Sequence, residues 1–143
     1  TEWTLMNGVM VIVKPSTLKA DEVRLSAKSL GGASLLSDED YFTGQLLPAI
    51  AAMSGVSNFS ATDLRKQLSG KPASVNLSVD DSANGLDGYA SPKDLETMLQ
   101  LLYLNFTQPR FSEDDFNTMV KMYKSYVENM TSNPDYIAQE ELI

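Results

Sequence analysis

Hydrophobic and polar residues alternate with a period of two along several short stretches of the chain, a pattern typical of β-strands. The stretches that predict strands are 3–13, 21–30, 73–79 and 85–90. The first is predicted to be a strand pair, because Asn7-Gly8 favours a two-residue hairpin turn. Its second strand is apolar at every position from Val9 to Val13, so we expect both of its faces to be covered.

The stretch 73–79 has a regular alternation of apolar and polar residues. Its valines and its leucine are predicted to face the core, and its polar residues are predicted to face outward. The outward residues are Ser74, Asn76 and Ser78. The sequence therefore predicts a strand with one apolar side and one polar, exposed side.

Between these strands, apolar residues recur every three or four positions, which predicts amphipathic helices. Four helices are expected to begin near a serine that is followed three residues later by an aspartate, a spacing that suits a helix N-cap. These serines are Ser37, Ser60, Ser91 and Ser112. A further helix is expected from Asn133-Pro134 to Ile143. Gly55 is predicted to end the first helix, and Pro48 is predicted to kink or break it.

The apolar stripes of two helices predict which side faces the core. For the helix after Ser91, the predicted stripe is Leu95, Met98, Leu99, Leu102 and Phe106. For the helix after Ser112, it is Phe116, Met119, Val120, Tyr123, Val127 and Met130. Strands thus come in pairs and helices in runs, which indicates an α+β fold with a largely antiparallel sheet covered on one face by helices. The 143 residues are enough for a single domain with its own core.

The composition narrows the range of functions. The net charge is −8, and nucleic acids and anionic membranes are bound by clustered Lys and Arg, so neither is expected as a main partner. No apolar run reaches the roughly 18 residues that a membrane span needs, and we expect no membrane insertion. Cysteine and histidine are both absent, which removes thiol chemistry, the usual general base at neutral pH and the commonest zinc ligand.

The remaining candidate motifs are weak. The segment 80–85 resembles the first half of a calcium-binding loop, but Ser91 stands where that loop needs an acid. Gly31-Gly32 lacks the lysine of a phosphate-binding loop, and the serines have no evident activating base. The residues alone therefore identify no catalytic residue, no metal ligand and no cofactor site in this chain.

Several segments match a known family in their order and spacing. They are 7–15, the strand that leads to Gly31-Gly32, 38–41, 54–60, and 91–96 continuing through Tyr103 and Phe106 to 109–111. Through them the chain resembles the pitrilysin/insulinase family of zinc metallopeptidases, most of all its large bacterial members. The resemblance implies the metallohydrolase fold that pitrilysin shares with mitochondrial processing peptidase, here truncated.

The resemblance also predicts what this chain lacks. Active domains of the family carry His-x-x-Glu-His on the first helix and a further Glu on a later helix. The corresponding stretch here, 45–53, contains neither His nor Glu. Ser125 and Tyr126 stand near the later position, and Glu128 is out of register. The family's zinc and catalytic residues therefore cannot be assigned here, and zinc is expected in the catalytic domain of a longer parent protein.

The leading hypothesis follows from that resemblance. Residues 1–143 are expected to be one inactive, partial domain from the C-terminal half of a zinc metalloendopeptidase that degrades peptides. The domain would pack against a homologous catalytic domain of the same polypeptide, form part of the chamber wall and contact peptide substrates. Because an exposed strand can pair with an extended peptide, Ser74, Asn76 and Ser78 are the hypothesised contact. The bacterial resemblance implies a periplasmic or cell-envelope location.

Two alternatives stay open at this point. In the first alternative, the chain is a peptidase-derived binding or assembly subunit without proteolytic activity, and it should form a stable complex and cleave no peptide. In the second alternative, it is an independent enzyme of unrecognised chemistry, and the isolated chain should turn over a substrate. If it is part of a larger protein, it should expose apolar surface where the rest of that protein docks.

Overall fold

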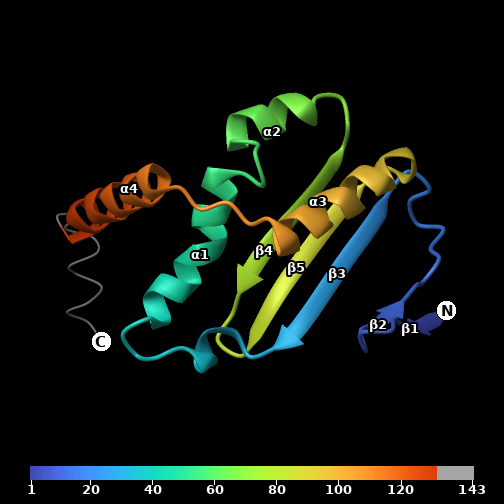
Figure 1. The fold of residues 1–143 in the computed structure, drawn as a ribbon, viewed down its shortest axis with the longest axis horizontal. Helices are drawn as coiled ribbons and strands as arrows, with labels where there is room; N and C mark the ends of the chain where they lie inside the picture. Colours follow the sequence, from blue (N-terminus) through green and yellow to red (C-terminus); the bar gives the residue numbers. More distant parts are fainter. Residues whose placement is uncertain (132–143) are drawn as a thin grey trace.

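The computed structural model describes residues 1–131 (Figure 1). The strands are β1 (Glu2–Thr4), β2 (Met10–Ile12), β3 (Val23–Leu30), β4 (Ala73–Val79) and β5 (Ala83–Ala90). The helices are α1 (Tyr41–Ser54), α2 (Ala61–Gln67), α3 (Leu95–Thr107) and α4 (Glu113–Thr131), with the 3₁₀ turns η1 (Gly32–Leu35) and η2 (Pro92–Asp94). The α+β class is confirmed. The helix expected from Asn133-Pro134 onward lies outside the described residues.

An antiparallel sheet in the order β3-β5-β4 forms the centre of the molecule. β5 is the middle strand because a tight turn at Asp81-Ser82 folds it back onto β4, while β3 pairs along its other side. The register places Leu25, Gly88 and Val75 side by side, and hence on one face of the sheet. Both α1 and α3 contact β4, and α3 also contacts β5, so helices cover this face as predicted.

The buried core lies where α3 crosses the sheet. Its buried members are Val56, Ala73, Ala90, Met98 and Leu101. A Cβ atom added at Gly88 would lie 2.9 Å from the Met98 sulfur, so the glycine allows α3 to approach the sheet closely.

The predicted stripe of α3 is partly wrong. Met98 is buried, but Leu99 and Phe106 are 44% and 70% exposed, and Leu101, which the prediction omitted, is buried. The physical reason is that α3 is apolar on more than one side, so periodicity alone does not select the side that meets the sheet. The packing selects the side of Met98 and Leu101.

Among the predicted signals at helix ends, those at Ser60, Ser112 and Gly55 are confirmed. Ser60 Oγ accepts a hydrogen bond of 3.2 Å from Asp63 N and caps α2, and Gly55, with φ of +91°, ends α1. Ser37 Oγ similarly accepts from Asp40 N at 3.2 Å, but α1 begins only at Tyr41. The Ser37 pair therefore closes a turn before the helix and does not cap it.

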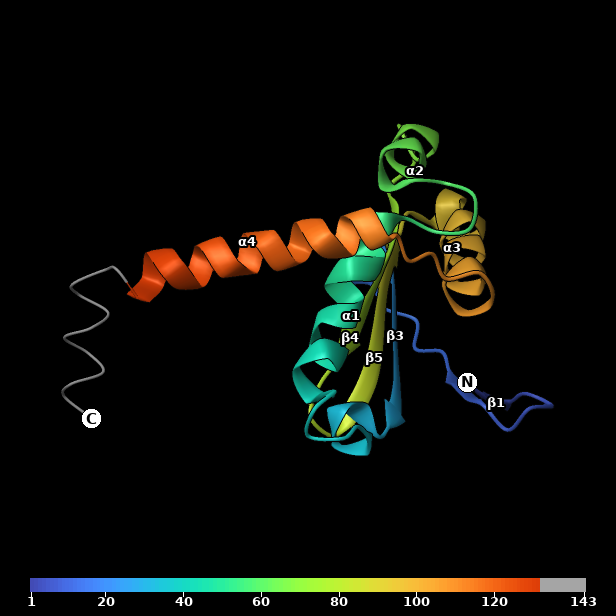
Figure 2. The same cartoon turned by 60° about the vertical axis from the view of Figure 1, so that its left-hand side comes forward.

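Two elements extend away from this compact body. The β1–β2 hairpin forms as predicted, but Leu5 N donates to the Val9 carbonyl, so its loop holds three residues and not the predicted two. Among the described residues, β1 and β2 pair only with each other, and α4 projects away from the sheet (Figure 2). The expectation that the β2 strand is covered on both faces is wrong within the described chain, since Val9, Met10 and Ile12 are at least half exposed. Along α4, Met119 is buried, whereas Tyr123 and Val127 are exposed.

Candidate functional site

The free edge of β4 is the candidate site. β4 pairs with β5 on one side only, and no other strand of the described residues pairs with its second side. An unpaired strand edge presents a row of backbone N–H and C=O groups that can bind another extended chain. Within residues 1–131, α1 contacts β4, but no strand pairs with this edge.

The ladder between β4 and β5 determines which backbone groups are free. Asp80 N donates to the Ala83 carbonyl at 2.8 Å, and Ser91 N donates to the Pro72 carbonyl at 3.1 Å. Opposed residues of an antiparallel ladder alternate between hydrogen-bonded and non-hydrogen-bonded pairs. These two bonds therefore determine the ladder phase, that is, which residue pairs of β4 and β5 are the hydrogen-bonded ones. The residues bonded to β5 are Ser74, Asn76 and Ser78. Those that direct their N–H and C=O to the free edge are Val75, Leu77 and Val79.

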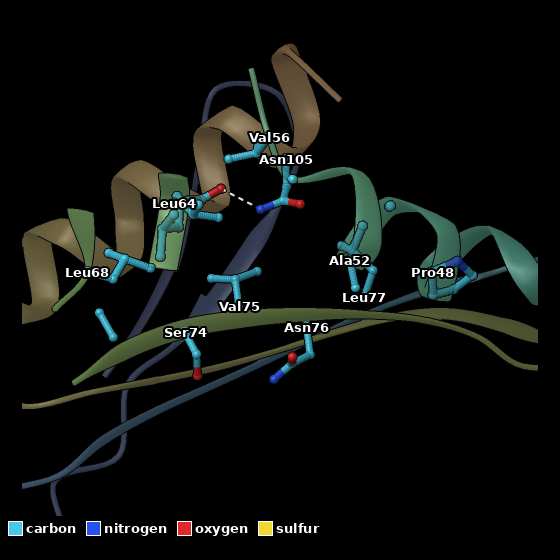
Figure 3. A pocket seen from close by; sticks show the side chains of 14 residues that line it. Pro48, Ala52, Val56, Leu64, Leu68, Ser74, Val75, Asn76, Leu77 and Asn105 are labelled. Carbon is cyan, nitrogen blue, oxygen red and sulfur yellow. Dashed lines mark hydrogen bonds between the residues drawn. The ribbon is translucent and has the colours of Figure 1, made fainter. Parts of the chain in front are cut away.

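A groove runs beside this free edge. It has a volume of about 270 Å³ and lies between β4 and the helices α1, α2 and α3 (Figure 3). Its walls are mostly apolar, and none of its lining residues is charged: Pro48, Ala51, Ala52, Gly55, Val56, Leu64, Leu68, Ala73, Ser74, Val75, Asn76, Leu77, Leu101 and Asn105. Such a groove suits aliphatic side chains and disfavours charged ones, because a buried charge without a partner is costly.

The side chains of β4 alternate between the groove and the opposite face of the sheet. Val75 and Leu77 point toward the helices, whereas Ser74 and Asn76 point away from them (Figure 3). The predicted orientation of the strand is therefore confirmed. The hypothesised contact residues lie on the open face of the sheet, next to Tyr89 and Asp87 of β5.

The two ends of β4 differ in charge. Lys71 precedes the strand, and Asp80 and Asp81 follow it, all exposed. Asp81 is held at the start of α1, where its carboxylate accepts hydrogen bonds from the Tyr41 hydroxyl at 2.5 Å and from Gln45 Nε2 at 3.3 Å. The bond to the Asp81 carboxylate raises the pKa of the Tyr41 phenol, which stays protonated and donates at neutral pH.

The described residues contain no group of three or more His, Cys, Asp or Glu side chains that could hold a metal ion. The part of α1 that would carry the family's zinc motif instead presents Pro48, Ala51 and Ala52 to the groove. No helix within residues 1–131 combines the length and apolarity needed to cross a bilayer. The groups that this site presents are the free backbone N–H and C=O groups of β4 and the apolar side chains of the groove.

The sequence predicted β4 as the contact strand, but it did not predict which of its backbone groups are free. It named Ser74, Asn76 and Ser78 for their polar side chains, whereas the unpaired N–H and C=O groups belong to the apolar residues between them. The missing signal is the position of the β4–β5 turn, because that turn sets the phase of the ladder.

Comparison with solved structures defines the class of this fold. The chain superimposes on the periplasmic protease PqqL from Escherichia coli with a TM-score of 0.82 at 18% identity, covering 97% of this chain and 16% of that structure. The ferredoxin protease FusC, solved as an E83A mutant with Arabidopsis ferredoxin, gives 0.80 at 19% identity, over 99% and 16%. A protease from Helicobacter pylori gives 0.72 at 17% identity, over 96% and 33%. The chain therefore has the fold of a peptidase domain.

Sequence comparison agrees with this class. The chain is 27% identical over 112 residues to a protein described as the probable zinc protease PqqL of Haemophilus influenzae. That match covers 78% of this chain and 12% of the relative. No protein-family model matches the chain. The resemblance stated from the sequence is thereby confirmed: the chain is similar in sequence and in fold to peptidases of the pitrilysin/insulinase type, and its sequence has no histidine for the zinc motif.

Proposed function

We propose that this chain is a non-catalytic domain of a longer zinc metalloendopeptidase, where it forms part of the chamber wall and holds peptide substrates along the β4 edge. The observation that carries the proposal is a domain of peptidase fold whose edge strand is open beside an apolar groove. Zinc and bond cleavage would belong to a homologous domain of the same polypeptide, because this sequence has no histidine.

The exposed apolar surface supports a partner domain. Large apolar side chains are exposed on the β1–β2 hairpin, on α3 and on α4, including Trp3, Met10, Tyr103, Phe106 and Tyr123. Apolar surface on this scale is a feature of interfaces, where it is removed from water. The chain also spans only 12% of its curated relative. A periplasmic location is proposed on the likeness to the Escherichia coli protease, which is described as periplasmic.

The first test is the coding sequence on both sides of residues 1–143. The proposal expects the reading frame to encode a His-x-x-Glu-His helix in a second domain of similar pattern. A start codon and a stop codon that enclose only these residues would contradict it, and the assembly-subunit alternative would then lead.

The second test is hydrolysis. The longer protein should cleave peptides in a zinc-dependent way, whereas the isolated 143-residue chain should cleave none at any zinc concentration. Turnover by the isolated chain would contradict the non-catalytic assignment and would favour an independent enzyme.

A further inference from the structure

The geometry of the β4 edge and its groove points to a specific class of ligand, and this inference rests on the proposed function. We infer that β4 binds an extended peptide that runs antiparallel to it. The peptide has aliphatic side chains at two positions separated by one intervening residue and a positive charge toward its N-terminal end. The ladder phase, the groove walls and the charges at the strand ends together define this ligand.

The ladder phase fixes which peptide side chains enter the groove. The backbone groups free to bond are those of Val75, Leu77 and Val79. A peptide residue opposite one of these has its side chain on the same face of the sheet, which is the helix face for Val75 and Leu77. Two peptide side chains, separated by one residue, therefore point toward the groove, and the side chain between them points to the open face beside Asn76.

The groove walls determine the chemistry of those two side chains. α1 contributes Pro48, Ala51 and Ala52, and α2 contributes Leu64 and Leu68. The small alanines leave room beside the strand, and the absence of a charged lining residue leaves a buried carboxylate or ammonium without a partner. A volume of about 270 Å³ is at the lower limit of small-molecule pockets, so it suits side chains of valine size.

The charges at the strand ends determine the direction of the peptide. Asp80 and Asp81 lie at the C-terminal end of β4, and Lys71 lies at its N-terminal end. An amino terminus or a lysine is attracted to the two aspartates, and a carboxyl terminus is attracted to Lys71. This arrangement places the peptide antiparallel to β4, which is also the slightly more stable ladder. The net charge of −8 adds a general preference for cationic peptides.

The test uses synthetic octapeptides and the 143-residue chain. The reference peptide has lysine near its N-terminus and valine at two alternate central positions, separated and flanked by serine or threonine. In one variant both valines become aspartate; in another the lysine moves to the C-terminal end. Dissociation constants come from titration, and amide exchange at Val75 and Leu77 reports whether the peptide occupies the edge. The reference peptide should bind at least about tenfold more tightly than either variant.

Matched protein variants test the groove itself. Ala52→Leu fills the groove from an exposed position of α1 and should weaken binding of the reference peptide by about tenfold. Thr43→Leu adds a leucine at an exposed position of the same helix that does not line the groove, and it should leave binding unchanged. Equal loss in both variants would overturn the assignment of the groove.

The outcomes separate this inference from the proposed function. If the valine and aspartate peptides bind with equal affinity and both slow amide exchange at the β4 edge, the groove preference is wrong, but β4 remains the peptide contact. Equal affinity for the lysine-shifted peptide overturns the direction. If no peptide protects Val75 and Leu77, both the inference and the proposed substrate contact are wrong.

Discussion

The compact body and the two projecting elements use apolar residues in different ways. In the body, the sheet and α3 bury Met98, Leu101 and Val56 against one another. In the β1–β2 hairpin and along most of α4, residues as apolar as Met10 and Tyr123 remain exposed. A two-stranded hairpin is marginal alone, because it buries too little surface to offset its lost entropy. The body therefore carries the stability of this chain, and we propose that a partner domain covers the projecting elements.

The largest effect is expected in the core of the body. Met98→Ala should lower the free energy of unfolding by about 2–5 kcal/mol, because it leaves a cavity between α3 and the sheet. Leu99→Ala, at the neighbouring and 44% exposed position, is the control and should cost less than about 1 kcal/mol. Urea denaturation measures both. Equal losses would mean that the buried side of α3 is assigned wrongly.

Two glycines with positive φ allow the same comparison for the backbone. Gly55 in the body and Gly8 in the hairpin have φ of +91° and +86°. Alanine at either place should cost about 1–3 kcal/mol in strain. At Gly55 the added Cβ would also lie 2.2 Å from the Phe59 carbonyl oxygen, whereas at Gly8 nothing lies within 4 Å. Thermal unfolding should therefore show the larger loss for Gly55→Ala; the reverse order would refute the described end of α1.

Within α4, two residues one helical turn apart differ in their burial. Met119 is 7% exposed and Tyr123 is 47% exposed. Met119→Ala should cost about 2 kcal/mol of unfolding free energy, and Tyr123→Ala should change it by about 0.5 kcal/mol or less. In a longer protein containing the partner domain, the cost of Tyr123→Ala should rise. If it stays small there, α4 is not part of the domain interface.

The smallest effect is expected from the ion pairs at the start of β3. Hydrogen bonds from Arg24 and Lys19 lower the pKa of Glu22 below its ordinary value of 4.5. A depressed carboxyl pKa adds stability above the unfolded value, and this stability is lost as the pH falls through the folded pKa. Glu22→Gln should therefore flatten the loss of stability below about pH 4.5. Asp21→Asn, which makes the same change of charge next door, is the control, and an identical flattening would contradict the role of these pairs.

How much of this could be predicted from the sequence depends on the kind of signal. The alternation in 73–79, the Asn7-Gly8 pair and the glycine after α1 are local signals, and each predicted the observed element, although the hairpin loop has three residues where two were predicted. The buried side of α3 and the exposure of the β1–β2 hairpin depend on packing between distant segments, which periodicity does not encode. The free backbone groups of β4 required the ladder phase, because polar side chains at Ser74, Asn76 and Ser78 say nothing about hydrogen bonds to β5.

If the edge of β4 holds an extended peptide, residue-resolved amide exchange should detect it. With a saturating peptide, exchange at Val75 and Leu77 should slow markedly, because their N–H groups gain partners. Exchange at Ser74 and Asn76 should change much less, because the ladder already bonds those amides to β5. We therefore expect protected and unchanged amides to alternate along β4. Uniform protection along β4, or protection confined to α4 or the hairpin, would contradict it.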